Sequence, residues 1–241
     1  MFATRFHIAA GFRWRHSTNL DELDKSFEPD SQATLMSEQL GKNFEDAAEL
    51  HDLIDSIHYI RDVIVRLDQY QREGRYPERL QPILKARNAV HHHLLCLSAA
   101  DALTKLGPTT TFLHKLCHTG LLIFSNLALF PLPPESGVAN RLAKMLSGAI
   151  EMALETEGDA IWSKHTGILT WAILLAGITT NSTTEYGTFV KYLTSVPSVP
   201  SYTTWERVED ELLSKTIWWP YMCSRAGKAM WLEARPRLDQ R

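Results

Sequence analysis

Cysteine is scarce in this chain of 241 residues, which contains only three. Cys96, Cys117 and Cys223 lie far apart, so neither a disulfide framework nor a thiolate zinc site is expected. A Gly-rich phosphate loop, a nucleophile elbow and a cysteine–histidine catalytic signature are also missing from the sequence. These absences favour a reducing compartment and give no indication of an enzyme.

A surplus of positive charge is missing too. The formal net charge is -3, which gives no electrostatic reason to expect direct binding to nucleic acid. The two most apolar runs, residues 119–132 and 167–178, are shorter than the roughly 20 residues that a bilayer-spanning helix needs. We therefore expect no nucleic acid and no membrane as partner, and we interpret both runs as buried helices.

The sequence is rich in helical periodicity. Hydrophobic residues make up 44% and charged residues 22%, which is typical of a globular protein. In the clearest helix, residues 46–70, apolar residues recur at spacings of three and four: Leu50, Leu53, Ile54, Ile57, Ile60, Val63, Ile64 and Leu67. Further helices are predicted at 80–103, 109–130, 138–150, 163–178, 184–196, 205–218 and 219–234.

Local signals refine these predictions. Residues 109–130 are apolar nearly all round, so this helix is expected at the centre of the bundle. Thr204 can cap the helix that begins at Trp205, and Pro220 is tolerated in the first turn of the last one. No sustained alternation of polar and apolar residues predicts a strand. The fold class is therefore all-α, an irregular multi-helix bundle of about seven to nine helices.

The first 41 residues differ from the rest. Residues 20–41 are acidic, rich in Ser and Gln and weakly periodic, so residues 1–41 are predicted to be a poorly ordered leader to a single helical domain, residues 42–241. Residues 1–19 carry arginines and aromatic residues but no acid, a composition that also suits a mitochondrial presequence. The alternative is that residues 1–19 are the irregular end of a shortened gene product.

Two groups of histidines are candidate metal ligands by residue type. Neighbours on a helix point about 100° apart, so the histidines at 91–93 cannot converge on one ion. His114 and His118, with Cys117 beside them, share one helix face. That segment lacks the glutamate of a metalloprotease helix and an identifiable third ligand. No metal site is predicted.

The acidic residues do not specify a reaction either. Asp52, Asp55 and Asp62 lie on the first long helix without a second acidic cluster, and we interpret them as its solvated face. No catalytic residue and no cofactor is therefore predicted.

Tryptophan is concentrated in the last third of the chain. The expected role of these large side chains is to fill the gaps between crossing helices. An exposed Trp218-Trp219 pair would instead be a hot spot for binding another protein. The five residues in question are Trp171, Trp205, Trp218, Trp219 and Trp231.

This spaced pattern resembles the C-terminal half of the fungal-specific transcription factor domain. The resemblance is carried by residues 167–177, 189–190, 205–208, 217–219 and 226–231, and residues 116–134 fit the preceding core of that family. In the family, a leucine-rich helix ending in small residues is followed by a Trp-Glu segment, a Leu-Trp ending and a final helix with Ala-Gly and Trp. The resemblance adds Gly177 and Gly227 to the tryptophans as candidate structural or interaction residues.

The resemblance implies a regulatory region of the kind that follows a binuclear zinc cluster. The six cysteines of that cluster are absent from this chain, so direct DNA reading by the usual route is not expected. The implied function is control of a gene set in the nucleus, such as a secondary-metabolism cluster, through contacts with transcription machinery or a full-length regulator. The resemblance leaves open whether a small-molecule effector also binds.

The sequence leaves two alternative functions open. One is an inactive or competing truncated paralogue, and the other is a helical metabolite-binding protein with a pocket lined by His114, His118 and Trp171. The cytoplasm is the alternative location.

Overall fold

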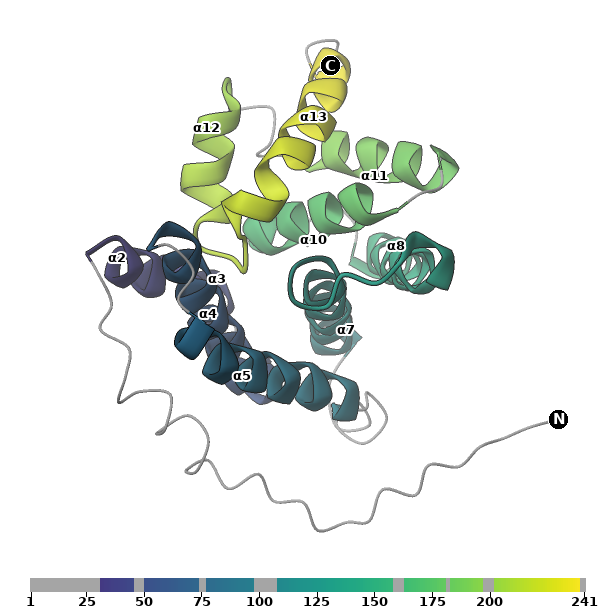
Figure 1. Ribbon diagram of the computed structural model, residues 1–241. Coiled ribbons are helices and arrows are strands. Elements are labelled where there is room, and N and C mark those ends of the chain that lie inside the picture. Colours follow the sequence, from purple (N-terminus) through teal and green to yellow (C-terminus); the bar gives the residue numbers. More distant parts are fainter. Residues whose placement is uncertain are drawn as a thin grey trace, which may run out of the picture.

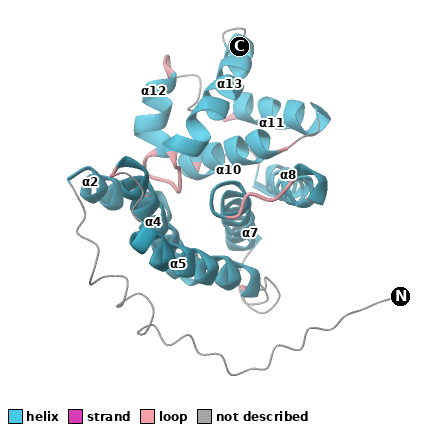
Figure 2. Cartoon of the chain, in the orientation of Figure 1, coloured by secondary structure: helices cyan, strands magenta, loops and turns pink. Residues whose placement is uncertain are grey.

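The computed structural model describes residues 31–45, 50–73, 77–97, 108–157, 163–180, 183–196 and 202–238. Within these ranges the regular secondary structure is helical and no strand occurs, as Figure 2 shows. The prediction of an all-α multi-helix bundle is confirmed. The predicted leader up to residue 30, its presequence alternative and the loop at 197–201 lie outside the described residues.

Seven of the helices in the described ranges have 13 or more residues. Short α-helices, two π-helical turns and a 3-10 turn join them. In chain order the elements are α2 (Ser31–Gln39), α3 (Lys42–Glu45), α4 (His51–Arg72), α5 (Pro77–Cys96), α7 (Pro108–Phe124), η3 (Ser125–Leu129), η4 (Pro134–Ser136), α8 (Val138–Glu157), α10 (Thr166–Thr179), α11 (Thr183–Ser195), α12 (Trp205–Val208), η6 (Glu209–Leu213) and α13 (Pro220–Leu238).

Helix α10 lies at the centre of the bundle. It packs against α7, α8, α11, α13 and η6, and the run from Ile168 to Gly177 is buried throughout (Figure 1). Helix α7 is mostly buried as well and packs against α4, α5, α8 and α10, so it shares the centre of the bundle with α10. Helix α10 is the more completely buried of the two, because it has no charged side chain.

The amphipathic stripe of the first long helix is confirmed. Helix α4 buries Leu53, Ile57, Ile60, Val63 and Ile64 and packs against α5, which in turn contacts α7. It ends at Arg72, just before Gly74. The predicted start of α4 at residues 46–49 and the predicted continuation of α5 beyond residue 97 fall outside the described ranges.

The ordered core begins earlier than predicted. Residues 31–41, assigned to a poorly ordered leader, contain α2, which packs on α4 and buries Ala33. Leu40 is also buried, and Gly41 turns the chain with a φ of 84°. The amide N–H of Gly41 donates to the carbonyl of Thr216 at 3.3 Å. The helical periodicity of residues 31–41 is weak because α2 contributes few apolar side chains to the core. Segments far away in the chain supply the other side chains that pack around it.

The helix after Thr204 is shorter than predicted. The Thr204 side chain caps it as expected, accepting the Arg207 amide N–H at 3.4 Å. The predicted helix to residue 218 is wrong beyond Leu213, because residues 214–219 form turns, bends and irregular backbone. The amide N–H of Asn43 donates to the Lys215 carbonyl at 2.9 Å, so segments far away in sequence satisfy backbone groups that a continuing helix would use.

The last helix agrees with its prediction at the start. Helix α13 begins at Pro220, where a missing backbone N–H costs little, and continues to Leu238. Its buried side contacts α10 and α11. None of the helices within the described ranges combines the length and apolarity needed to cross a bilayer.

Candidate functional site

The five candidate tryptophans, at positions 171, 205, 218, 219 and 231, all lie in the core. None is more than 3% exposed. The hypothesis that Trp218 and Trp219 form an exposed hot spot is therefore wrong, and these side chains fill space between crossing helices. Because these tryptophan side chains are buried, they can influence a binding surface only indirectly, by fixing how the helices pack against one another.

Three of these residues form what we call the tryptophan cluster: Trp205, Trp218 and Trp231. The ring of Trp205 lies 6.2 Å from that of Trp218 and 6.4 Å from that of Trp231, measured between centroids. A Cβ atom at Gly227 would lie 2.9 Å from Cη2 of Trp205 and 3.0 Å from Cη2 of Trp218. The cluster therefore needs a glycine at position 227, because any side chain there would displace two rings.

Half-buried carboxylates accept hydrogen bonds from two of the indoles. Nε1 of Trp218 donates to Oε1 of Glu209 at 2.9 Å, and the Ser224 hydroxyl donates to the same oxygen. Nε1 of Trp219 donates to Oδ1 of Asp68 at 3.3 Å. Sequence reasoning missed Glu209 and Asp68, and the 151-residue separation of Asp68 from Trp219 left no local signal for that contact.

Trp171 connects the centre of the bundle to three other segments. Its Nε1 donates to the Ile217 carbonyl at 2.7 Å, and its ring meets Phe44 of α3 edge-on with centroids 5.1 Å apart. A Cβ at Gly120 of α7 would lie 2.6 Å from the Trp171 ring. Gly120 therefore allows α7 and α10 to approach closely around this indole.

Gly177 has a similar role at the other end of α10. A Cβ at this position would lie 2.4 Å from Sδ of Met230 and 3.5 Å from Cβ of Phe189. The glycine thus brings α10 close to both α13 and α11. Together, the candidate residues interlock segments that are up to 151 residues apart in the chain.

The histidines at 91–93 point in different directions, as their spacing predicts. Nδ1 of His91 lies 2.9 Å from the Ser125 hydroxyl, and its ring is 4.5 Å from that of Phe130. His92 is exposed, with Nδ1 3.6 Å from Sγ of Cys96. Among the residues that the structure describes, no group of three or more His, Cys, Asp or Glu side chains is placed to hold a metal ion.

The surroundings of His91 shift its pKa. Burial lowers the pKa of His91 below 6.5, and the charges of Arg87 and His92 lower it further. Arg87 itself lies over the Phe130 ring, 4.2 Å from the centroid. The α5–η3 contact therefore favours a neutral imidazole.

This shift predicts a pH-dependent stability. The contribution of a histidine with a lowered folded-state pKa is complete above its unfolded pKa, about 6.5, and is lost as the pH falls from there through the lower folded-state pKa. We expect the free energy of unfolding to drop less between about pH 7 and pH 5 in His91→Gln than in the unchanged protein. Urea unfolding at both pH values measures this difference. Replacing the exposed His92 with Gln removes only one of the smaller causes of the lowered His91 pKa and should reduce the drop by less. A drop in His91→Gln equal to that of the unchanged protein would contradict the assignment.

His114 and His118 share one face of α7, as predicted. Their rings stack with centroids 6.2 Å apart, and Nε2 of His118 lies 2.9 Å from the Leu94 carbonyl oxygen. Burial raises the pKa of the Cys117 thiol well above its usual range, so this residue is a poor source of a thiolate ligand. Trp171 is fully buried and packs against Gly120 and Phe44.

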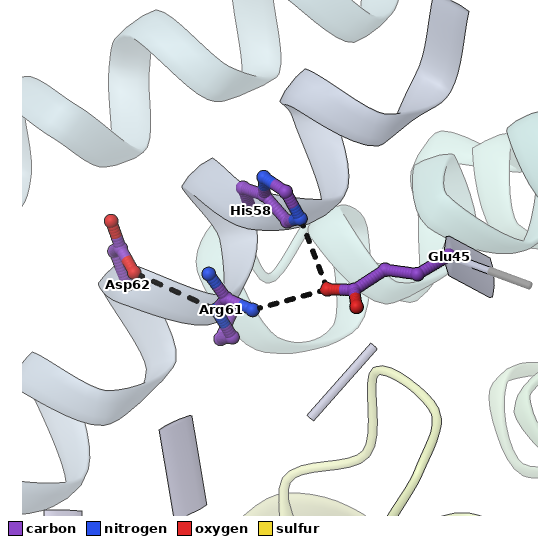
Figure 3. Close-up of polar contacts among 4 residues, drawn as sticks. All are labelled: Glu45, His58, Arg61 and Asp62. Atoms are coloured by element: carbon purple, nitrogen blue, oxygen red, sulfur yellow. Dashed lines mark hydrogen bonds and ion pairs between the residues drawn. The ribbon is translucent and has the colours of Figure 1, made fainter. Parts of the chain in front are cut away.

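The acidic residues of α4 lie at its surface. Asp55 is exposed, and Asp62 lies 3.8 Å from Nε of Arg61. Arg61 and His58 also contact Oε1 of Glu45, at 3.4 and 3.1 Å, as Figure 3 shows. These part-exposed groups neutralise one another, and such surface pairs contribute little stability. The interpretation of a solvated face is confirmed for Asp55 and Asp62, whereas the side chain of Asp52 lies outside the described part.

A pocket that sequence analysis did not predict lies beside Trp218. It has a volume of about 460 Å³, lies between α2, α4 and residues 209–220, and is within the usual range for small-ligand sites. Apolar and acidic side chains line it, chiefly Leu35, Met36, Trp218, Asp68, Glu209 and Asp210. The tryptophan cluster therefore forms part of its wall.

Comparison with protein-family models, with curated proteins and with solved structures finds no match to this chain.

Proposed function

We propose that this protein is a regulator-like helical domain that controls a gene set in the nucleus, such as a secondary-metabolism cluster, through contacts with other proteins. It would carry no DNA-reading module and no catalytic activity of its own. The partners would be transcription machinery or a full-length regulator.

The observation that carries this proposal is the packing of the tryptophan and glycine pattern. The residues that resemble the fungal-specific transcription factor domain lie in separate segments, yet they contact one another in the core. Gly227 meets Trp205 and Trp218, and Gly177 meets Met230. A pattern whose spaced members interlock in this way supports an interpretation as a domain signature rather than a chance composition.

The surface of α13 supports a role in protein binding. Tyr221 and Leu232 are 63% and 48% exposed, and both lie on the helix whose buried side carries Gly227 and Trp231. Exposed aromatic and aliphatic side chains on a rigid helix are suited to contact another protein. The core pattern thus fixes the helix, and the helix presents the contact residues.

The proposal is tested by deleting the gene and measuring transcripts. We expect a defined set of transcripts to change, and to be restored by the unchanged gene but not by Trp205→Ala, which would disrupt the tryptophan cluster. Lys191→Ala, on the exposed side of α11, is the matched control and should restore the transcripts. Transcripts that stay unchanged in the deletion under all conditions would contradict the proposal and favour an inactive or competing paralogue.

A second candidate function is binding of a small metabolite. The 460 Å³ pocket beside Trp218 favours it, and its acidic lining suits a ligand with an apolar body and a positive charge. Thermal shift and tryptophan fluorescence against a panel of organic amines test this candidate. The absence of any ligand shift would remove it.

A further inference from the structure

The outward side of α8 has the residue spacing of a helix that pairs with another helix. The inward side carries the buried Ala143, Leu146, Ala149 and Ile150 and faces α7, α10 and α11. On the outward side, exposed residues follow one another at alternating steps of four and three, the spacing of the contact positions in two-stranded coiled coils. We call these five residues the α8 seam: Arg141, Met145, Gly148, Met152 and Glu155.

The middle of the α8 seam is apolar and open. Met145 and Met152 are 56% and 53% exposed. Gly148 lies between them, and a Cβ atom there would meet nothing within 4 Å. Glycine weakens an exposed helix interior relative to alanine, but it lets a second helix approach closely. The seam therefore has a flexible apolar surface on either side of a point of close approach.

The charges of α8 are ordered along its length. Arg141 and Lys144 lie near the N-terminal end, whereas Glu151 and Glu155 lie near the C-terminal end. Lys144 directly precedes Met145, and Glu151 directly precedes Met152, so both flank the seam on the same side. On a second α8 helix that runs antiparallel to the first, the negative residues lie beside the positive residues of the first helix.

The order of charges along α8 is therefore complementary to that of a second α8 helix in antiparallel orientation. With a two-fold axis near Gly148, Arg141 lies opposite the partner's Glu155, and Lys144 lies opposite the partner's Glu151. Symmetry repeats both pairs, because a two-fold interface uses the same patch on both subunits. A parallel arrangement would place like charges together, which is unfavourable.

We propose that the α8 seam is the interface of an antiparallel homodimer. Among the described residues, helix α8 lies at the edge of the bundle with its neighbouring helices on one side, so a second copy can reach the seam (Figure 1). The seam is roughly 21 Å long at 1.5 Å per residue, which makes this a small interface. We therefore expect a dissociation constant on the order of 10–100 µM.

The Arg141–Glu155 pair gives the sharpest test. Lys144 and Glu151 also contact α11, through Glu185 at 3.4 Å and Tyr192 at 2.8 Å, so changing them would alter the subunit itself. Arg141→Glu and Glu155→Arg each convert both symmetric pairs from attraction to repulsion. Each variant alone should dimerise at least about tenfold more weakly, since the change affects two contacts per dimer.

An equimolar mixture of the two variants should restore the dimer. In the mixed pair, Glu at 141 of one subunit faces Arg at 155 of the other, and Arg141 of the second subunit faces Glu155 of the first. Sedimentation equilibrium of the full-length chains from about 1 to about 500 µM covers the expected range. Arg225→Glu, on the exposed side of α13, is the control with the same change in charge and should dimerise like the unchanged protein.

Three results would overturn this proposal. They are an unchanged protein that stays monomeric over the whole range, an Arg141→Glu variant that dimerises as tightly as the unchanged protein, and a mixture that associates no better than its components. Circular dichroism of each variant verifies that the helices are intact. The proposal does not rest on gene regulation, so the transcript experiment and the dimerisation experiment can fail independently.

Discussion

Replacing Trp171 with alanine is expected to lower the free energy of unfolding by about 3–5 kcal/mol, the cost of removing a large aromatic side chain from a core. Trp171 is fully buried, packs against Phe44 and Gly120, and donates a hydrogen bond to the Ile217 carbonyl. Its removal leaves a cavity between α10, α7 and α3 and a buried carbonyl without its donor. Urea unfolding followed by circular dichroism measures the loss.

A pair of phenylalanine variants separates the hydrogen bond from the packing. Trp171→Phe loses the bond to Ile217, whereas Nε1 of Trp231 is buried without a partner among the described residues, so Trp231→Phe loses none. We therefore expect Trp171→Phe to be less stable than Trp231→Phe by about 1–2 kcal/mol. Equal losses would mean that the Trp171 bond contributes nothing. A loss below about 1 kcal/mol in Trp171→Ala would contradict the central position of this residue.

Replacing Gly227 with alanine is expected to lower the free energy of unfolding by about 2 kcal/mol. The added methyl group would lie about 3 Å from ring atoms of both Trp205 and Trp218, which are buried and cannot move aside without displacing other side chains. Overpacking of this kind costs up to about 3 kcal/mol, and the better helix propensity of alanine offsets about 1 kcal/mol. Tryptophan fluorescence should report the displaced rings directly.

The same substitution at an open glycine is the matched control. A Cβ atom at Gly187 of α11 would meet nothing within 4 Å. Gly187→Ala should therefore stabilise the protein by about 0.5–1 kcal/mol, because it gains helix propensity without a clash. If both variants were stabilised, Gly227 would not be needed for the close approach of the two tryptophans.

These variants also bear on the proposed function. A regulator that acts through α13 needs that helix to be held in one place, and the tryptophan cluster around Gly227 holds it. Gly227→Ala should therefore impair both stability and the restoration of transcripts, whereas Gly187→Ala should impair neither. The variants of the α8 seam act at a different surface and test a separate property.

The sequence by itself determined the fold class and most helices. The periodic apolar residues of α4, the proline at the start of α13 and the threonine cap before Trp205 are local signals, and each local signal acts within a few residues. The alternating four- and three-residue steps of the α8 seam are also readable from the sequence, but only burial shows which side of α8 faces outward.

The tertiary structure decided everything that depends on distant partners. The sequence does not predict helix α2, because its few apolar residues are buried only through packing against α4. The end of the helix after Thr204 is not predictable either, because Gly41, Asn43 and Trp171 donate hydrogen bonds to the carbonyl groups of residues 215–217. The exposure of Trp218 and Trp219 was likewise undecidable from spacing, since Glu209 and Asp68 hold both indoles inside. Periodicity records which side of an element is apolar, whereas burial depends on which other elements cover it.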